Sequence, residues 1–206
     1  YSYLFCFIAA YFSIFISSNA EFIGMVIGGE EFKDALMIIM LMALYPVHNV
    51  YGLIVSNILL VRGRTDFLRN VALITLIPGV AISFFLIAPV ESHGFGLGAM
   101  GLAIKVLAIQ FISVNIYLMN VVKYLKLSFL KEVGNQVVII LTLYALVKLT
   151  QYSVLLYIDN MFIIFIVSGI FYSVLAYALI MFYPAIIGMT YTEVRHYSEM
   201  IKKQLN

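Results

Sequence analysis

The chain has 206 residues, of which 64% are hydrophobic and 11% are charged, and its mean hydropathy is +1.07. A soluble domain carries roughly 25% charged residues, so this composition excludes a soluble protein and predicts an all-α integral membrane protein. The formal net charge of +2 identifies no partner, because the placement of charges matters more than their sum in a membrane. Cys6 is the only cysteine, so we expect a buried small side chain, with no intrachain disulfide, metal site or cofactor.

Six apolar segments are predicted to span the bilayer, because a bilayer core requires about 20 apolar residues of helix. The segments that meet or approach this length are 1–17, 35–61, 71–87, 97–119, 134–152 and 161–183. A further patch, 22–27, is too short to span, and we expect it to be the end of the first helix or a short broken turn. Tyr1 lies inside an apolar segment with no charged leader before it, so we expect no signal peptide and a longer parent protein.

Basic residues predict the orientation of these segments. If six helices alternate in direction, nine basic residues share one side: Arg62, Arg64, Arg69, Lys123, Lys126, Lys131, Arg195, Lys202 and Lys203. The other side has Lys33 and Lys148, and Lys105 lies inside a span. By the positive-inside rule, the first side and the C-terminus are cytoplasmic. Residues 1–190 would form one helical bundle, and residues 191–206 a cytoplasmic tail that is either a short amphipathic helix or a frayed end.

Acidic residues are all predicted in loops or at helix ends, so we expect no carboxylate in the middle of the membrane. Intramembrane carboxylates mark many proton and sodium sites, and enzymes need an acid or base near the reacting group. Their absence argues against a self-contained ion-coupled pump and against an enzyme.

The second predicted span, 35–61, carries a polar face. Its members within roughly 60° of one another at helical spacing are Tyr45, Asn49, Gly52 and Ser56, with His48 at the edge. The face either lines a cavity or packs closely against another helix through Gly52 and Ser56. In the third span, Pro78 and Gly79 predict a kink.

The fourth predicted span holds the strongest candidate site. Its polar residues within an arc of roughly 140° are Lys105, Gln110, Ser113, Tyr117 and Asn120. Lys105 lies about 12 Å along the helix, and a cation inside a span costs about 2.5–3.5 kcal/mol. Lys105 either faces a water-filled cavity or extends to the outer interface. The basic turn with Arg62, Arg64 and Arg69 either anchors the chain to anionic lipid or binds a phosphate-bearing substrate.

Three stretches carry a resemblance to a known family: EFIGMVIGGEEFKDALMIIMLMAL (21–44), ILLVRGRTDFLRN (58–70) and GLGAMGLAIKVLAIQF (96–111). In order and spacing they resemble the C-terminal half of a polysaccharide transporter. This family belongs to the flippase superfamily that also holds lipid II flippases and multidrug extrusion (MATE) proteins. The resemblance implies helices nine to fourteen of a fourteen-helix transporter in the bacterial inner membrane, without the first eight helices.

The resemblance also implies a function. Such a transporter moves undecaprenyl-pyrophosphate-linked oligosaccharides outward by alternating access between two lobes, and it is not an enzyme. Its expected partners are the lipid-linked substrate, the phospholipid bilayer, the missing N-terminal helices and polysaccharide polymerase or assembly proteins, but not nucleic acid. The expected cavity residues are Lys105, Gln110, Ser113, Tyr117, Tyr45, His48 and Asn49. The alternatives are a MATE-like drug or cation antiporter, a membrane-embedded glycosyl or acyl transferase, and a structural membrane subunit.

Overall fold

The computed structural model describes residues 2–156, 160–196 and 200, and the regular elements in this part of the chain are all helices. Five helical stretches are long and apolar enough to cross a membrane, and the shorter apolar helix at 2–18 precedes them. The prediction of an all-helical protein with apolar membrane-spanning helices is therefore confirmed. These helices fit a multi-pass membrane protein.

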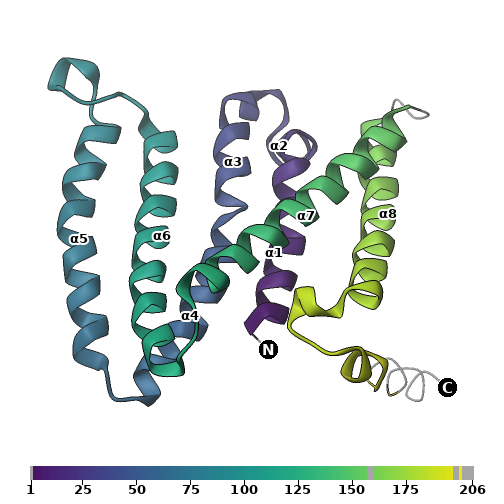
Figure 1. The fold of residues 1–206 in the computed structure, drawn as a ribbon. Coiled ribbons are helices and arrows are strands. Elements are labelled where there is room, and N and C mark those ends of the chain that lie inside the picture. Colours follow the sequence, from purple (N-terminus) through teal and green to yellow (C-terminus); the bar gives the residue numbers. More distant parts are fainter. Residues whose placement is uncertain (1, 157–159, 197–199, 201–206) are drawn as a thin grey trace.

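The first two crossings are each built from two helices (Figure 1). The first consists of α1 (Ser2–Ser18) and α2 (Ala20–Gly28), and the 3-10 helix η1 (Gly29–Ala35) reverses the chain. The second consists of α3 (Leu36–Met42) and α4 (Tyr45–Val61). Gly29, with φ +63°, adopts a positive-φ conformation that glycine tolerates, and it follows the end of α2. The apolar patch 22–27 is thus part of a helix that continues the first crossing.

The remaining crossings are single helices. They are α5 (Thr65–Ile87), α6 (Gly98–Leu125), α7 (Phe129–Leu155) and α8 (Met161–Phe182), with the short elements η2 (Val90–Ser92) and η3 (Pro184–Ile187). The side chain of Asn160 starts α8 by accepting hydrogen bonds from the amides of Phe162 and Ile163, at 3.0 and 3.2 Å. After η3, residues 191–196 begin a further helical turn; Lys202 and Lys203 of the predicted tail lie outside the described residues.

Several helices are longer than the predicted segments. α5 begins at Thr65 and not at residue 71, and α7 covers 129–155 and not 134–152. The predicted boundaries were too short because polar end turns were assigned to loops, although polar residues are common where a membrane helix reaches the interface. As a result, Arg69 and Glu132 belong to helices.

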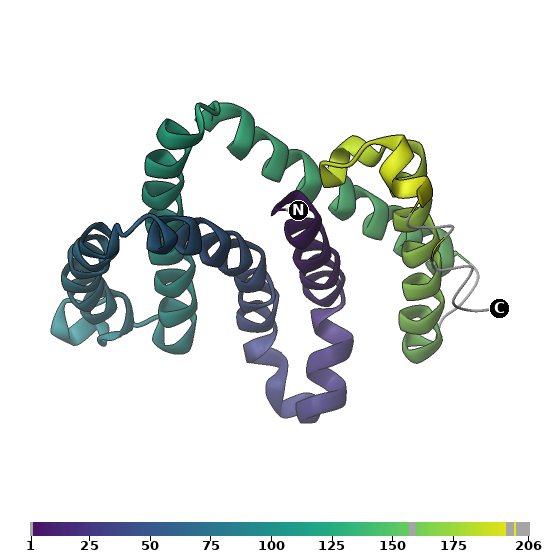
Figure 2. The same cartoon turned by 90° about the horizontal axis from the view of Figure 1, so that it is seen from below.

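The helices form a row that turns at α7. α5 and α6 pair at one side, α3–α4 and α1–α2 occupy the centre, and α7 crosses them obliquely to reach α8 (Figures 1 and 2). One buried cluster joins α1, α7 and α8 around Ile14, Leu143 and Tyr172. A second joins α4 to α6 around Leu59 and Val114. We call these the α1–α7–α8 core and the α4–α6 core.

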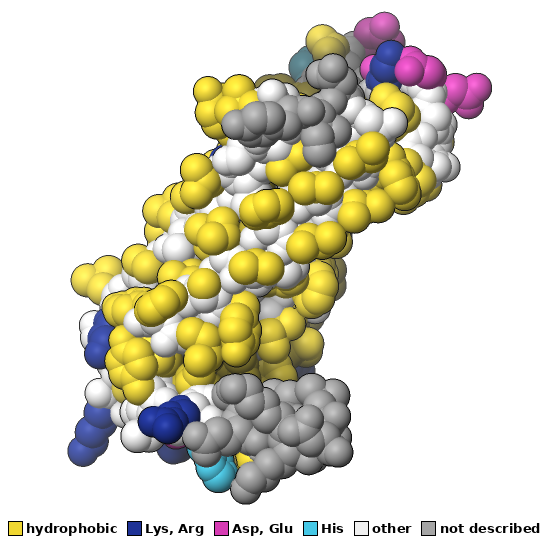
Figure 3. All heavy atoms as spheres, turned by 90° about the vertical axis from the view of Figure 1, so that its right-hand side faces the viewer, with side chains coloured by type: hydrophobic (Ala, Val, Ile, Leu, Met, Phe, Trp, Pro, Cys, Tyr) yellow, Lys and Arg dark blue, Asp and Glu magenta, His cyan; other side chains and the backbone are white. Residues whose placement is uncertain are grey.

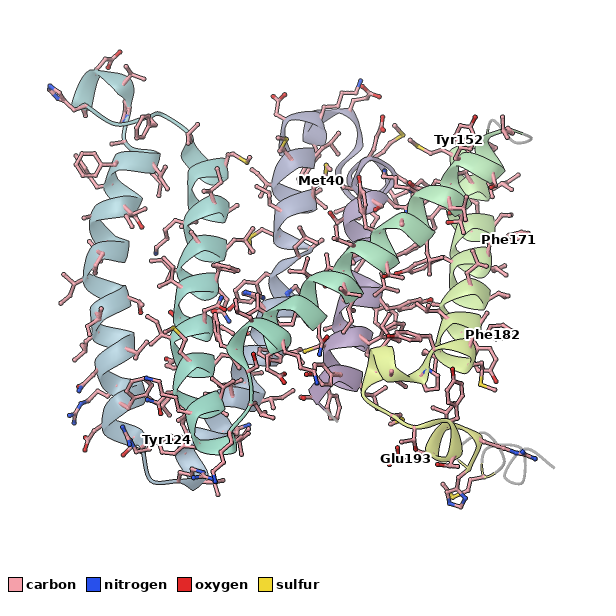
Figure 4. The ribbon with its side chains drawn as sticks, viewed as in Figure 1. Met40, Tyr124, Tyr152, Phe171, Phe182 and Glu193 are labelled. Carbon is pink, nitrogen blue, oxygen red and sulfur yellow. The ribbon has the colours of Figure 1, made fainter. Side chains whose placement is uncertain are left out.

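The face of the molecule on the α8 side is apolar along its length and carries charged side chains at its two ends (Figure 3). Large side chains such as Phe171 and Phe182 project from α8 with more than half of their surface exposed (Figure 4), as expected for contact with lipid tails. η1 places Glu30, Glu31 and Asp34 at one end of the helices, which we call the acidic end. The turns after α4 and α6 lie at the opposite, basic end, as does the start of α1.

Candidate functional site: a cationic groove between α4, α5 and α6

An open groove of about 610 Å³ lies between α4, α5 and α6. Its polar lining residues are Asn49 and Ser56 from α4, Arg69 and Thr75 from α5, and Lys105, Gln110, Ser113 and Tyr117 from α6. The α6 residues from 105 to 117 extend over about 18 Å of helix. The structure therefore brings four members of the predicted α6 stripe together with Asn49. Asn120, the fifth member of the stripe, does not line the groove.

The approach of α5 to α6 gives the groove its wall at Lys105. Gly79 faces α6 so closely that an added Cβ would lie 2.5 Å from Cδ1 of Ile109 and 3.5 Å from Cε of Lys105. α5 remains helical through Pro78, so this stretch is a continuous wall. The small residue at 79 lets the Lys105 stem pass between the two helices.

The polar face of α4 both lines the groove and packs against α6. Gln110 Nε2 donates a hydrogen bond to Asn49 Oδ1 at 3.3 Å, which joins α6 to α4 between two groove-lining residues. An added Cβ on Gly52 would lie 2.6 Å from Cγ2 of Val114, so Gly52 permits close packing of the same two helices. Asn49 and Ser56 line the groove, and Gly52 both lines it and packs against Val114.

Tyr45 and His48 are not among the residues that line the groove, unlike the expectation from the sequence. The His48 ring stacks parallel on Phe111 with 5.0 Å between ring centroids, and its Nε2 is buried without a hydrogen-bond partner among the described residues. Helical spacing placed both residues near Asn49. It did not show which side of α4 is covered by α6. His48 lies against α6 outside the groove.

The groove carries positive charge. Lys105 is half-buried, and no hydrogen bond or ion pair joins it to another described residue. Arg69 is paired with Asp66 at 3.0 Å, but both side chains are well exposed, and such pairs contribute little. No described carboxylate lines the groove. Because attraction between charges strengthens as water is excluded, the Lys105 ammonium favours an anionic ligand.

Arg62 and Arg64 lie outside the groove and hold the α4–α5 turn against α6. Arg64 Nη1 donates to the hydroxyl of Tyr124, at the end of α6 (Figure 4). The guanidinium of Arg62 lies 5.1 Å from the Tyr124 ring centroid, within the range of a cation–π contact. These two arginines therefore have a packing role at the basic end.

A buried carboxylate was not anticipated from the sequence. Glu132, in the first turn of α7, is only 8% exposed and accepts hydrogen bonds from Tyr3 and Tyr51. Its position at a helix end agrees with the prediction, but its burial does not. A signal was present, because the buried residues of α7 recur at 132, 136, 139, 143, 147, 150 and 154, which is one helix face that begins at Glu132.

The described residues include no group of three or more His, Cys, Asp or Glu side chains that could hold a metal ion. Comparison with protein-family models, with curated proteins and with solved structures gave no match. Function is therefore inferred from the groove itself.

Proposed function

We propose that the chain is part of a flippase that moves an anionic lipid-linked oligosaccharide, of the undecaprenyl-pyrophosphate class, across the bacterial inner membrane by alternating access. The observation that carries this proposal is the groove between α4, α5 and α6, in which Lys105 has no ionic partner among the described residues and no described carboxylate lines the wall. The basic end would face the cytoplasm, because the turns after α4 and α6, with the helix turns beside them, hold Arg62, Arg64, Arg69, Lys123, Lys126 and Lys131.

The chemistry of the groove matches the parts of such a substrate. A pyrophosphate would accept charge-assisted hydrogen bonds from the Lys105 ammonium. Sugar hydroxyls would pair with the amides of Asn49 and Gln110 and with the Ser113 hydroxyl, all of which line the groove. The isoprenoid tail would remain among lipid tails beside the apolar outer surface of the helices.

The same lining argues against the alternative transporter. A groove for an organic cation would be expected to contain a carboxylate, whereas the ionisable residues of this groove are Arg69, Lys105 and Tyr117. Positive charge would repel a cationic drug. An anionic substrate is therefore the better match.

Movement of a fluorescent polyprenyl-pyrophosphate oligosaccharide between the leaflets of vesicles that contain the intact protein tests the proposal. We expect Lys105→Gln to slow movement by about 10-fold or more, because a hydrogen bond to a charged group contributes about 1.5–3 kcal/mol. Lys105→Arg should retain more activity than Lys105→Gln. Lys148→Gln is the control, since Lys148 lies on α7 and donates to Gln151, away from the groove.

Two results would contradict the proposal. One is a Lys105→Gln protein that moves the lipid-linked oligosaccharide at the wild-type rate. The other is a wild-type protein that transports organic cations while leaving the lipid-linked oligosaccharide in its original leaflet, which would favour the antiporter.

A further inference from the structure

Two arginines of the turn between α4 and α5 converge on one tyrosine of α6. The guanidinium carbons of Arg62 and Arg64 lie 5.1 and 5.7 Å from the centroid of the Tyr124 ring, and Arg64 Nη1 donates to the Tyr124 hydroxyl. Arg64 also lies over the Phe67 ring, at 5.9 Å. Tyr124 thus holds both cations at the basic end of α6 (Figure 4). We call Arg62, Arg64 and Tyr124 the arginine–tyrosine site.

The charge of the arginine–tyrosine site is not neutralised by the protein. Neither Arg62 nor Arg64 forms an ion pair with another described residue. The acid nearest to them in the sequence is Asp66, which is paired with Arg69 at 3.0 Å. Two like charges beside one ring repel each other unless an anion lies close to both. The site therefore favours an anionic ligand.

The hydrogen-bond donors of the site suit a phosphate group. A guanidinium has five N–H donors in a planar fork. Of these, Arg64 uses one on Tyr124, and Arg62 donates to no other described residue. Both side chains are exposed, while the ring contacts restrict the positions of the two guanidiniums. Oxygens of one phosphate accept parallel hydrogen bonds from such forks, so phosphate is the anion that matches the site.

Exposed aliphatic side chains lie next to the site in the sequence. Leu60 and Val61 come just before Arg62, and Leu125 follows Tyr124; between 42% and 89% of the surface of each aliphatic side chain is exposed. A soluble anion does not cover these side chains, whereas lipid tails would remove them from water. The adjoining helices are long and apolar enough to cross a membrane, which places this end where headgroups meet hydrocarbon. The phosphate is therefore expected to belong to a lipid.

We infer that Arg62, Arg64 and Tyr124 form a binding site for the phosphate of an anionic phospholipid of the bilayer. The two guanidiniums donate charge-assisted hydrogen bonds to the phosphate oxygens, and the lipid tails lie against the aliphatic side chains of the turns. Because the arginines belong to the α4–α5 turn and Tyr124 to α6, the bound lipid adds a link between this turn and α6.

The lipid-linked substrate of the proposed function is a second source of phosphate, but the groove is elsewhere. None of the three residues of the arginine–tyrosine site lines the groove, whereas Arg69, about one turn into α5, does. A phospholipid bound outside the groove requires no transport. The inference therefore goes beyond the proposed function and does not rest on it.

The site is tested by native mass spectrometry of the intact protein in detergent, titrated with dioleoyl phosphatidylglycerol. We expect Arg62→Gln and Arg64→Gln together to raise the dissociation constant about 10-fold or more, because charge-assisted hydrogen bonds are lost. Arg62→Lys and Arg64→Lys together keep the charge but lose the planar fork, so this protein should also bind more weakly than wild type. Lys123→Gln and Lys131→Gln together are the matched control, since they remove the same charge from exposed residues of the basic end outside the site.

Two further ligands identify the source of the phosphate in the wild-type protein. Phosphatidylcholine with the same tails should bind more weakly than phosphatidylglycerol, because its choline group balances the phosphate charge. Inorganic phosphate at equal concentration should not displace phosphatidylglycerol, because it has no tails. These comparisons, and the double lysine variant, decide the question even where the double glutamine variant fails to fold.

Several results would overturn the inference. One is an equal affinity for phosphatidylglycerol in wild type and in either double arginine variant. Another is an equal loss of affinity in the double glutamine variant and in the lysine control, which would show an effect of surface charge alone. Displacement by inorganic phosphate would indicate a soluble anion. A polyprenyl pyrophosphate that loses affinity in the double glutamine variant, while phosphatidylglycerol keeps it, would assign the site to the substrate. None of these measurements uses transport, so failure of the lipid site leaves the proposed function untouched.

Discussion

Gly79 of α5 lies against Lys105 of α6, so that an added Cβ at 79 would be 3.5 Å from Lys105 Cε and 2.5 Å from Ile109 Cδ1. This close approach leaves room for the lysine stem between the helices and opens the groove at its ammonium. We predict that Gly79→Leu fills this part of the groove and lowers movement of the lipid-linked oligosaccharide, although the charge of Lys105 is unchanged. Wild-type transport by a folded Gly79→Leu protein would show that this end of the groove is not used.

Gly52 provides a test of helix packing between α4 and α6. An alanine there would place its Cβ 2.6 Å from Cγ2 of Val114, which is β-branched and buried. We expect Gly52→Ala to lower the free energy of unfolding in detergent by about 1–3 kcal/mol. Gly134→Ala is the matched control, because nothing lies within 4 Å of its added Cβ and alanine favours a helix by about 1 kcal/mol. Equal effects of both variants on unfolding would contradict the packing role of Gly52.

The break between α1 and α2 is joined to α7. Gln151 Nε2 donates to Asn19 Oδ1 and to the carbonyl of Ser18, both at 3.1 Å. A double-mutant cycle with Asn19→Ala and Gln151→Ala should give an interaction energy of about 0.6 kcal/mol, as is typical between membrane helices. The Ser153 hydroxyl donates to the carbonyl of Leu149 in its own helix. The effects of Asn19→Ala and Ser153→Ala on the free energy of unfolding should therefore be additive. Additivity of the Asn19 and Gln151 variants would argue against this contact.

Glu193 predicts a local pH dependence after α8. The backbone amide and hydroxyl of Thr190 donate to its carboxylate at 2.8 and 2.7 Å and hold its pKa below the ordinary value of 4.5. Because the folded pKa is lowered, the stabilisation is complete above pH 4.5 and is lost as the pH falls through the folded pKa. In a carbon-13 NMR titration, Thr190→Val should move the Glu193 pKa up towards its ordinary value. Tyr191→Phe should leave the Glu193 pKa unchanged, since the Tyr191 hydroxyl donates to the carbonyl oxygen of Phe182.

The apolar segments and the polar stripe of α6 were predictable from the sequence. A crossing requires a long apolar run, and the helical period alone places Lys105, Gln110, Ser113 and Tyr117 on one side. The structure adds which helices cover that side. Asn49 accepts a hydrogen bond from Gln110 in the groove lining, while His48, one residue earlier, stacks on Phe111 outside the groove. Such a difference depends on the rotation of α4 about its axis, which local spacing does not determine.

Burial of polar residues at helix ends was harder to predict. A hydropathy pattern assigns Glu132 to a loop, because Lys126, Ser128 and Lys131 lie just before it in the sequence. Its burial depends on tyrosines at positions 3 and 51, which are far away in the sequence. The joint at Asn19 likewise depends on Gln151, more than a hundred residues later. The helical period of α7 includes Glu132 in the buried face, but it does not show which distant side chains donate hydrogen bonds to it.

The most direct test of the central claim is the accessibility of the groove to water. In a Cys6→Ala background, cysteines at Lys105 and Ser113 should react with a membrane-impermeant thiol reagent. A cysteine at Ile104, which is exposed but does not line the groove, should remain unreactive in the membrane. A polyprenyl-pyrophosphate oligosaccharide should slow the reaction at Ser113→Cys, where Lys105 is retained. If Lys105→Cys and Ser113→Cys never react, the groove is closed to water and the proposed site is wrong.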